Sequence, residues 1–191
     1  MNSIKKAVTS YPVLEVIRNR WSPRAFSDKI IDESSLNSLF EAASWAASAA
    51  NEQPWQYIYA SRGSDGFNNI WDCLLPGNQP WAKHAACLVI AVARTTYQAS
   101  GKANPYAQHD LGMANAHLLL QASANGIYSH AMAGFNRNAL IETIKLADNQ
   151  DPVCVIALGY LSAPDSLEEP FRSREQQPRS RKQLSAFTFK I

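Results

Sequence analysis

Residues 86–93, ACLVIAVA, are the stretch that decides the fold. An unbroken apolar run of this length, rich in small and β-branched residues, predicts a β-strand that is buried on both faces. A second run of the same character, VCVIALGYL, occupies residues 153–161. Helix-like segments alternate with such strands along the chain, so both strands are expected at the centre of a sheet that helices cover.

Outward from these runs, apolar residues recur at the spacing of amphipathic helices. The pattern predicts helices over residues 12–20, 35–50, 67–75, 107–125 and 136–147, and further strands over 56–61 and 127–132. Asp32 or Ser34 is expected to cap the second helix, Asn136 to cap the last, and Gly126 to follow the end of the longest.

Beyond Leu161 the chain becomes polar and rich in proline, and it ends in the aromatic residues Phe187 and Phe189. An apolar tip on a polar segment is expected to pack against another surface. The prediction is therefore a single domain over residues 1–191, whose extended tail, about residues 162–191, lies on a second subunit.

Composition narrows the class of protein. The 191 residues include 46% hydrophobic but only 18% charged residues, against about 25% charged in typical soluble domains. A folded monomer of this mass is expected to expose about 9,000 Å². The net charge of +2 argues against disorder and against a globally basic nucleic-acid binder.

The sequence shows neither a membrane-spanning segment nor a signal peptide. No apolar run approaches the ~20 residues of a membrane span, and the first eleven residues do not resemble a signal peptide. The three cysteines, Cys73, Cys87 and Cys154, are far apart and odd in number, so they are expected to be reduced core residues. The expected location is cytoplasmic, with no membrane partner.

Familiar catalytic and nucleotide-binding motifs are also missing. The sequence contains no G-x-G-x-x-G, no P-loop and no G-x-S-x-G elbow. Its four histidines show no metal-ligand spacing, so no metal site is expected. If the protein is an enzyme, a cofactor is expected to supply the reactivity.

Two short basic segments have the chemistry of a phosphate site. They are Arg20-Trp21-Ser22-Pro23-Arg24 and Arg179-Ser180-Arg181. Arginine forks and hydroxyls provide the charge and donors that a phosphate monoester needs. Alternatively, each segment is only a solvated basic turn, or residues 172–182 form a small nucleic-acid patch with salt-sensitive binding.

A third segment, Asn51-Glu52-Gln53-Pro54-Trp55, follows the alanine-rich helix. Asn and Gln amides can read the donor and acceptor edges of a heterocycle. On local grounds a helix stop followed by a core tryptophan explains the segment equally well.

Taken in order, these segments resemble the flavin-dependent nitroreductase family. The resemblance runs from Pro12 to Arg181, and its motifs are R-x-S-x-R, N-x-Q-P-W, Gly77-Asn78 with Trp81, the helix that begins His109-Asp110-Leu111-Gly112, Gly134-Phe135, Gly159-Tyr160 and Arg179-Ser180-Arg181. It implies an α+β fold of three layers, α/β/α, with a central, mostly antiparallel mixed sheet. It also implies a homodimer with FMN at the interface.

The resemblance implies a role for each matching residue. Arg20, Arg179 and Arg181, assisted by Ser22, would hold the FMN phosphate, and Arg24 would reach the pyrimidine side of the flavin ring. Asn78 would bond the pyrimidine edge, and Met132-Ala133-Gly134 would lie against the ring. The cofactor set is completed by Trp21, beside the phosphate arginines, and by Ser48, Ala49, Asn51 and Gln53; of these last four, Ser48, Ala49 and Asn51 would come from the other subunit.

Several positions depart from the family pattern. Ala47 and Ala49 replace a proline and a serine, Ala133 stands where some members have Glu, and Trp81 where some have Lys. Without that lysine, Arg24 is left as the main cation near the pyrimidine, which affects the flavin potential and substrate preference.

The implied activity is a ping-pong oxidoreductase. NADH or NADPH reduces the flavin and leaves, and a nitroaromatic, quinone or similar small acceptor takes its place, so no protein residue is expected to act as nucleophile or acid. We expect Trp71, Tyr97 and Tyr106 to cover the substrate slot. The alternatives are other flavin chemistry (dehalogenation, flavin fragmentation or dehydrogenation of a small metabolite) and a flavin-binding or storage protein without catalysis.

Overall fold

The centre of the molecule is a four-stranded sheet, seen in a computed structural model that describes residues 3–191. The strands are β1 (Trp55–Ser61), β2 (Cys87–Arg94), β3 (Tyr128–Met132) and β4 (Gln150–Gly159), in the order β1-β2-β4-β3. The two apolar runs form the central pair, as predicted. Residues 87–93 of β2 and 155–159 of β4 are buried because helices cover both faces of the sheet.

Every strand pairing within residues 3–191 is antiparallel. The parallel component of a mixed sheet is therefore absent from this part of one chain. Two of the pairings join consecutive strands, β1 with β2 and β3 with β4, and the third joins β2 to β4. The register of β2 against β4 shifts between Ala91, which pairs with Cys154, and Val92, which pairs with Pro152, so Val153 of β4 is left unpaired in this ladder.

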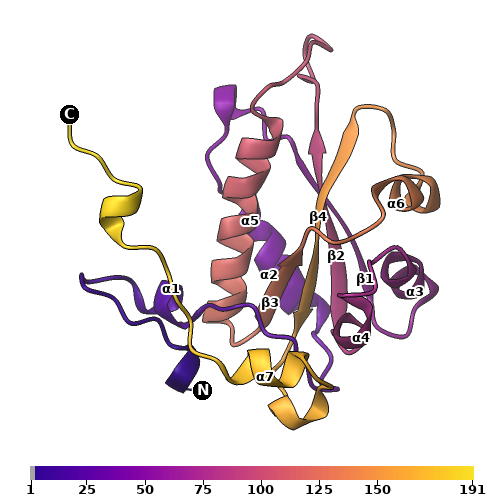
Figure 1. Cartoon of the computed structure of the whole chain (residues 1–191). Helices are drawn as coiled ribbons and strands as arrows, with labels where there is room; N and C mark the ends of the chain where they lie inside the picture. The colour runs from indigo at the N-terminus through magenta and orange to yellow at the C-terminus, as the bar shows by residue number, and fades with distance from the viewer. Residues whose placement is uncertain (1–2) are drawn as a thin grey trace.

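Helices form a layer on each face (Figure 1). On one face α2 (Glu33–Ser44) and α5 (Ala107–Ala124) pack against the sheet, with α1 (Glu15–Asn19) beside α5. On the other face lie α3 (Asp65–Asp72), α4 (Gln79–Ala82) and α6 (Arg137–Ile144). Alternate residues of β2 pack against the two helix layers. This is the α/β/α arrangement that was expected.

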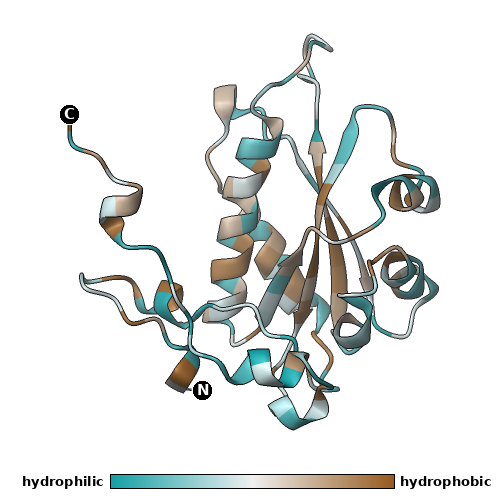
Figure 2. Ribbon diagram, in the orientation of Figure 1, coloured by the Kyte–Doolittle hydropathy of each residue, from teal (hydrophilic) through white to brown (hydrophobic). Residues whose placement is uncertain are grey.

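The hydropathy of the chain follows these layers. Figure 2 shows the most hydrophobic colours on the central strands and on stretches of the helices that lie against them. On α5 the buried residues include Leu111, Ala114, Leu118 and Ala122, which recur at helical spacing. The helix was predicted to within one residue, and Gly126, at a φ of 70°, follows its end.

Local capping explains where two other helices begin. The Asp32 carboxylate accepts a hydrogen bond from the Ser35 backbone N–H at 2.8 Å, and the Asn136 side chain accepts one from Ala139 N–H at 3.1 Å. Both caps were expected.

The predicted helix over residues 35–50 is too long, because α2 ends at Ser44. The alanines that follow favour helix, but Ala50 and Asn51 have φ values of 53° and 54°. The Ala49 N–H donates to the Asp110 side chain at 2.9 Å, so a tertiary contact overrides local propensity here.

The first part of the tail folds back on its own chain. It contains α7 (Phe171–Gln176), which the sequence did not predict. Ser162 N–H donates to the Ala25 carbonyl at 3.0 Å, and Leu167 is buried in the core. From Arg181 onward the residues are exposed, so only about the last ten extend away from this chain.

The three cysteines carry no disulfide, and Cys73 and Cys87 are buried. None of the helices in residues 3–191 has the length and apolar character needed to span a bilayer.

Candidate functional site

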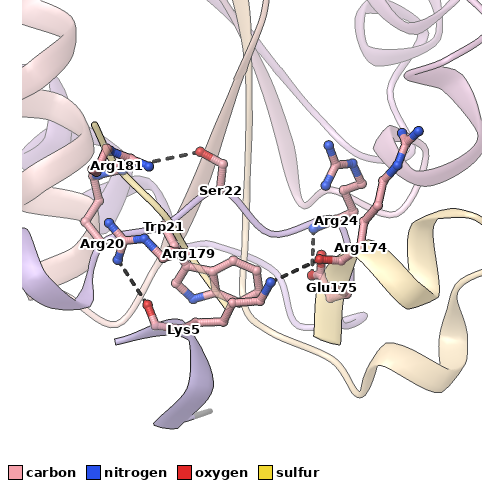
Figure 3. Close-up of a pocket in the computed structure, with 9 residues that line it drawn as sticks. All are labelled: Lys5, Arg20, Trp21, Ser22, Arg24, Arg174, Glu175, Arg179 and Arg181. Carbon is pink, nitrogen blue, oxygen red and sulfur yellow. Dashed lines mark hydrogen bonds between the residues drawn. The ribbon is translucent and has the colours of Figure 1, made fainter. Parts of the chain in front are cut away.

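A cationic pocket of about 200 Å³ opens where three separate parts of the chain meet (Figure 3). Six cations and one carboxylate are among its lining residues, which are Lys5, Arg20, Trp21, Ser22, Arg24, Arg174, Glu175, Arg179 and Arg181. The structure thus brings the two basic segments of the sequence together. Lys5, Arg174 and Glu175 were not predicted, and the only available signal was the basic run in the tail.

The segment of residues 20–24 leaves α1 in an extended conformation, because Pro23 does not favour a continued helix. Trp21 is buried and meets the ring of Tyr128 edge-on, with the centroids 6.3 Å apart. The Arg20 guanidinium donates to the Ser22 hydroxyl at 3.4 Å. The charged and hydroxyl groups of this segment are therefore held on one side of a fixed backbone.

The electrostatics of the pocket favour an anion. Burial lowers the pKa of Arg20, Arg24 and Arg179 from the usual value, and repulsion from neighbouring arginines lowers it further, although the Glu175 carboxylate opposes the shift of Arg24. Arginine stays protonated nonetheless. A dianion placed among these groups would relieve both penalties, and a phosphate monoester matches the donors present.

Lys5 and Glu175 are buried in the wall of this pocket. The Lys5 ammonium donates to the carbonyls of Arg174 (3.1 Å) and Gln177 (2.6 Å) and lies 4.9 Å from the Trp21 ring centroid. Burial lowers the pKa of Lys5, although the nearby Glu175 carboxylate opposes this shift. Lys5 therefore ties the N-terminal segment to the tail.

Arg24 points from the pocket towards an aromatic platform, which consists of the rings of Trp81 and His130. Its guanidinium carbon lies 5.8 Å from the ring centroid of Trp81, which is 1% exposed. Trp81 in turn stacks on His130 at 4.5 Å. Burial lowers the pKa of His130 to about 4, helped by Arg24 and Arg20, and its Nδ1–H donates to the Pro23 carbonyl at 2.9 Å.

Asn78 and Gly134 lie together at the end of this platform. Asn78 Nδ2 donates to the Gly134 carbonyl at 2.9 Å, and a Cβ on Gly134 would lie 2.7 Å from that nitrogen. The Trp81 indole N–H donates to the Gly77 carbonyl at 3.2 Å, which links this corner to Arg24. Met132 is buried and Ala133 is exposed. Contacts thus run from the pocket through Arg24 and Trp81 to Asn78 and Gly134.

The remaining predicted cofactor residues lie elsewhere in the chain. They are Ser48, Ala49, Asn51 and Gln53, in a strained turn that precedes β1. This turn lies beside the first turn of α5, where the Asp110 side chain accepts a hydrogen bond from the Ala49 N–H. Asn51 and Gln53 line a second cavity beside the exposed Trp45. The helix that leads into Arg20 instead packs near the other end of α5, where Val16 lines a groove with Leu120 and Ala124.

The three aromatic residues expected at the substrate slot do not meet within one chain. Trp71, at the end of α3, donates its indole N–H to the Gln79 carbonyl at 2.9 Å. Tyr97 lies in the hairpin after β2, and Tyr106 is 53% exposed directly before α5. Tyr97 and Tyr106 belong to the segment between β2 and α5. In this segment Gln98 N–H donates to the Glu52 side chain at 2.6 Å, so the segment lies beside the turn of residues 48–53.

The fold and the pocket together define an α+β protein of three layers with a cationic pocket beside the edge strand β3 of its sheet. The family model that matches this chain is the nitroreductase family, over residues 17–75 and 73–160. The chain belongs to the nitroreductase family.

Individual relatives agree with this assignment. A solved structure described as an oxidoreductase containing FMN has a TM-score of 0.90 and 31% identity, covering 95% of this chain and 93% of that one. A nitroreductase family protein of Streptococcus pneumoniae TIGR4 shares the fold, with a TM-score of 0.73 and 19% identity over 93% of this chain and 98% of its own.

A relative from Archaeoglobus fulgidus is 29% identical over 153 residues, which are 77% of this chain and 84% of that protein. Its name assigns it provisionally to the NADH dehydrogenase/NAD(P)H nitroreductases.

Proposed function

We propose that this protein is an FMN-dependent oxidoreductase whose cationic pocket holds the phosphate of the cofactor. The observation that carries the proposal is the convergence of Arg20, Ser22 and Arg181 on one cavity, from segments about 160 residues apart. Half-buried arginines that repel one another are costly without an anion. A similar protein of known structure contains FMN.

The direction of the cofactor follows from the contacts beyond the pocket. With the phosphate at Arg20 and Arg181, the polyol and ring would extend past Arg24 towards Asn78 and Gly134. Arg24 would then present its cation to the pyrimidine side, held over Trp81. Gly134 has no Cβ, which leaves room for the Asn78 side chain against the backbone and keeps the Asn78 amide at this edge of the proposed ring site.

We further propose that the active form is a homodimer. One chain exposes 10,940 Å², about 1,900 Å² more than expected for a monomer of this mass. Exposed apolar side chains include Leu14, Leu184, Phe187 and Phe189. The pocket and the strained turn lie towards opposite ends of α5, so a two-fold pairing of these helices would bring Ser48, Asn51 and Gln53 of one subunit to the pocket of the other.

Bound FMN would supply the electron-transfer chemistry, accepting electrons from NADH or NADPH and passing them to a nitroaromatic, a quinone or a similar small acceptor. The protein residues would bind and orient the cofactor and exclude water from it. Arg24 would stabilise negative charge at the pyrimidine edge, and Asn78 would hold the ring through its amide. The donor is proposed from the name of the Archaeoglobus relative and from the family, and a cytoplasmic location from the sequence.

Purification tests the proposal directly. We expect a yellow protein that absorbs near ~450 nm, releases FMN on denaturation and oxidises NADH or NADPH in the presence of menadione or nitrofurazone. Colourless protein that takes up no added FMN would refute the cofactor assignment. Bound FMN without turnover of either nicotinamide would support a storage protein instead, and salt-sensitive binding of an oligonucleotide by colourless protein would support the nucleic-acid alternative.

A further inference from the structure

The segment of residues 18–25 carries three groups that face the cationic pocket, Arg20, Ser22 and Arg24. Apart from its first residues in α1, this segment has no regular secondary structure, so helix or sheet hydrogen bonds do not fix its shape. Several of its backbone groups are nevertheless bonded by other parts of the chain. The tail supplies a partner near each end, Arg179 for the Arg18 carbonyl and Glu175 for the Arg24 N–H. This arrangement suggests a function for the tail that is separate from any contact with a second subunit.

We infer that Glu175 and Arg179 are positioning residues that hold the two ends of the segment 18–25 and so set the geometry of Arg20, Ser22 and Arg24. The test of this inference rests on the proposed function, because the measured quantity is the affinity for FMN, which depends on where these three side chains lie.

Glu175 holds the C-terminal end. Its Oε1 accepts hydrogen bonds from the backbone N–H of Arg24 at 2.8 Å and of Ala25 at 3.1 Å. The side chain is 2% exposed, so these are buried, charge-assisted bonds. They fix the peptide plane from which the Arg24 side chain starts (Figure 3).

Arg179 holds the N-terminal end. Its Nη1 donates to the backbone carbonyls of Arg18 at 2.9 Å and of Lys5 at 3.0 Å. One terminal nitrogen is thus already committed to the backbone. Arg181, two residues later, donates to the neighbouring Ser180 carbonyl at 2.7 Å, its one guanidinium bond within residues 3–191, so its other nitrogens stay available for an anion.

A carboxylate is an unexpected lining residue for a phosphate site. If Glu175 acted only through its charge, it would repel the phosphate, and its removal would tighten FMN binding. If it acts by holding the Arg24 and Ala25 N–H groups, its removal would weaken binding instead. The two roles therefore predict effects of opposite sign.

The experiment compares Glu175→Gln with Glu175→Leu in the full-length chain, stripped of flavin and titrated with FMN. Gln keeps an oxygen acceptor for both N–H groups but loses the charge, whereas Leu loses both. We expect Gln to bind FMN at least as tightly as the wild-type protein. We expect Leu to weaken binding about tenfold or more, because two buried N–H groups lose their acceptor.

Equal or tighter FMN binding by the Leu variant would overturn the inference. So would a loss of affinity in the Gln variant as large as that in Leu, since it would assign the effect to charge. Failure of the wild-type protein to bind FMN would instead refute the proposed function, which keeps the two outcomes distinguishable.

Arg179→Met provides an independent test if the Leu variant does not fold. Riboflavin lacks the phosphate, so a residue that only contacts phosphate affects FMN binding alone. Arg179→Met is expected to weaken riboflavin and FMN binding alike, because the displaced segment also carries Arg24. Arg181→Met serves as the comparison and is expected to spare riboflavin. An Arg179→Met variant that spares riboflavin would contradict a positioning role for Arg179.

Discussion

Arg181 and Lys182 are neighbours in the sequence, but only Arg181 lines the cationic pocket. Arg181→Met is expected to raise the dissociation constant for FMN about 10- to 100-fold, because one charge-assisted phosphate contact contributes about that much affinity. Because Arg181 is exposed and holds no other element, the thermal midpoint of the flavin-free protein should stay close to that of the wild type.

Lys182→Met is the matched control, since it removes the same charge one residue away. It should leave FMN binding nearly unchanged. Equal effects of the two substitutions would show that the tail acts through its overall charge and not through a specific contact.

His130 predicts a pH dependence of stability. Its pKa is about 4 in the folded protein, below the unfolded value of about 6.5. Between these values the unfolded chain binds more protons, so the free energy of unfolding should fall as the pH drops from about 6.5 to 4, by at most about 1.4 kcal/mol per pH unit.

Denaturant unfolding of wild-type protein and His130→Gln at pH 7 and pH 5 measures this effect. The variant should lose less stability between the two pH values than the wild type. It should keep some dependence, because burial also lowers the pKa of His84. Parallel pH profiles for the two proteins would contradict a buried neutral His130.

At the scale of elements, the end of β4 is packed against the segment that follows the pocket. A Cβ on Gly159 would lie 2.7 Å from the ring of Phe26. Gly159→Ala is therefore expected to lower the free energy of unfolding by about 1–3 kcal/mol, the range for overpacking a core.

Gly77→Ala is the control for this substitution, because nothing lies within 4 Å of the added Cβ. Its effect should stay within about 0.5 kcal/mol. Chemical denaturation of the two variants compares them directly, and a Gly159→Ala protein as stable as Gly77→Ala would refute the close packing of Phe26.

Helix α6 depends on its N-terminal cap. Asn136→Ala removes the acceptor for Ala139 N–H and should destabilise the protein by about 1 kcal/mol. Asn136→Ser retains a capping oxygen and should recover most of that loss. The measurement is the midpoint of urea unfolding, and equal losses for Ala and Ser would show that the cap contributes little.

At the scale of the whole molecule, the excess exposed surface predicts association. Sedimentation of the full chain should give about twice the monomer mass of 21.1 kDa at micromolar concentration. Removal of residues 183–191 should raise the dimer dissociation constant, because Leu184, Phe187 and Phe189 are exposed in one chain.

The same truncation should leave the fold of each subunit intact, as these residues pack against little of their own chain. Circular dichroism and the FMN titration provide that check. A full-length monomer, or a truncated protein that dimerises as well as the full chain, would contradict a role for the tip at a subunit interface.

The amino-acid sequence by itself determined the central strands, the longest helix and the two basic segments. These features are local, because an unbroken apolar run, a helical period and a cluster of arginines can each be seen within a short stretch. The motif resemblance led to the family, which the family model confirms. The cofactor residues and the substrate aromatics remain predictions.

Only the tertiary structure decided how the segments meet. The alanine-rich segment ends its helix at Ser44 because Asp110, more than 60 residues away, bonds the Ala49 N–H. The tail returns to its own chain because Glu175 and Arg179 bond backbone groups near α1. Such contacts join residues far apart in the chain, and no local pattern of residue types encodes which distant backbone group a buried side chain will satisfy.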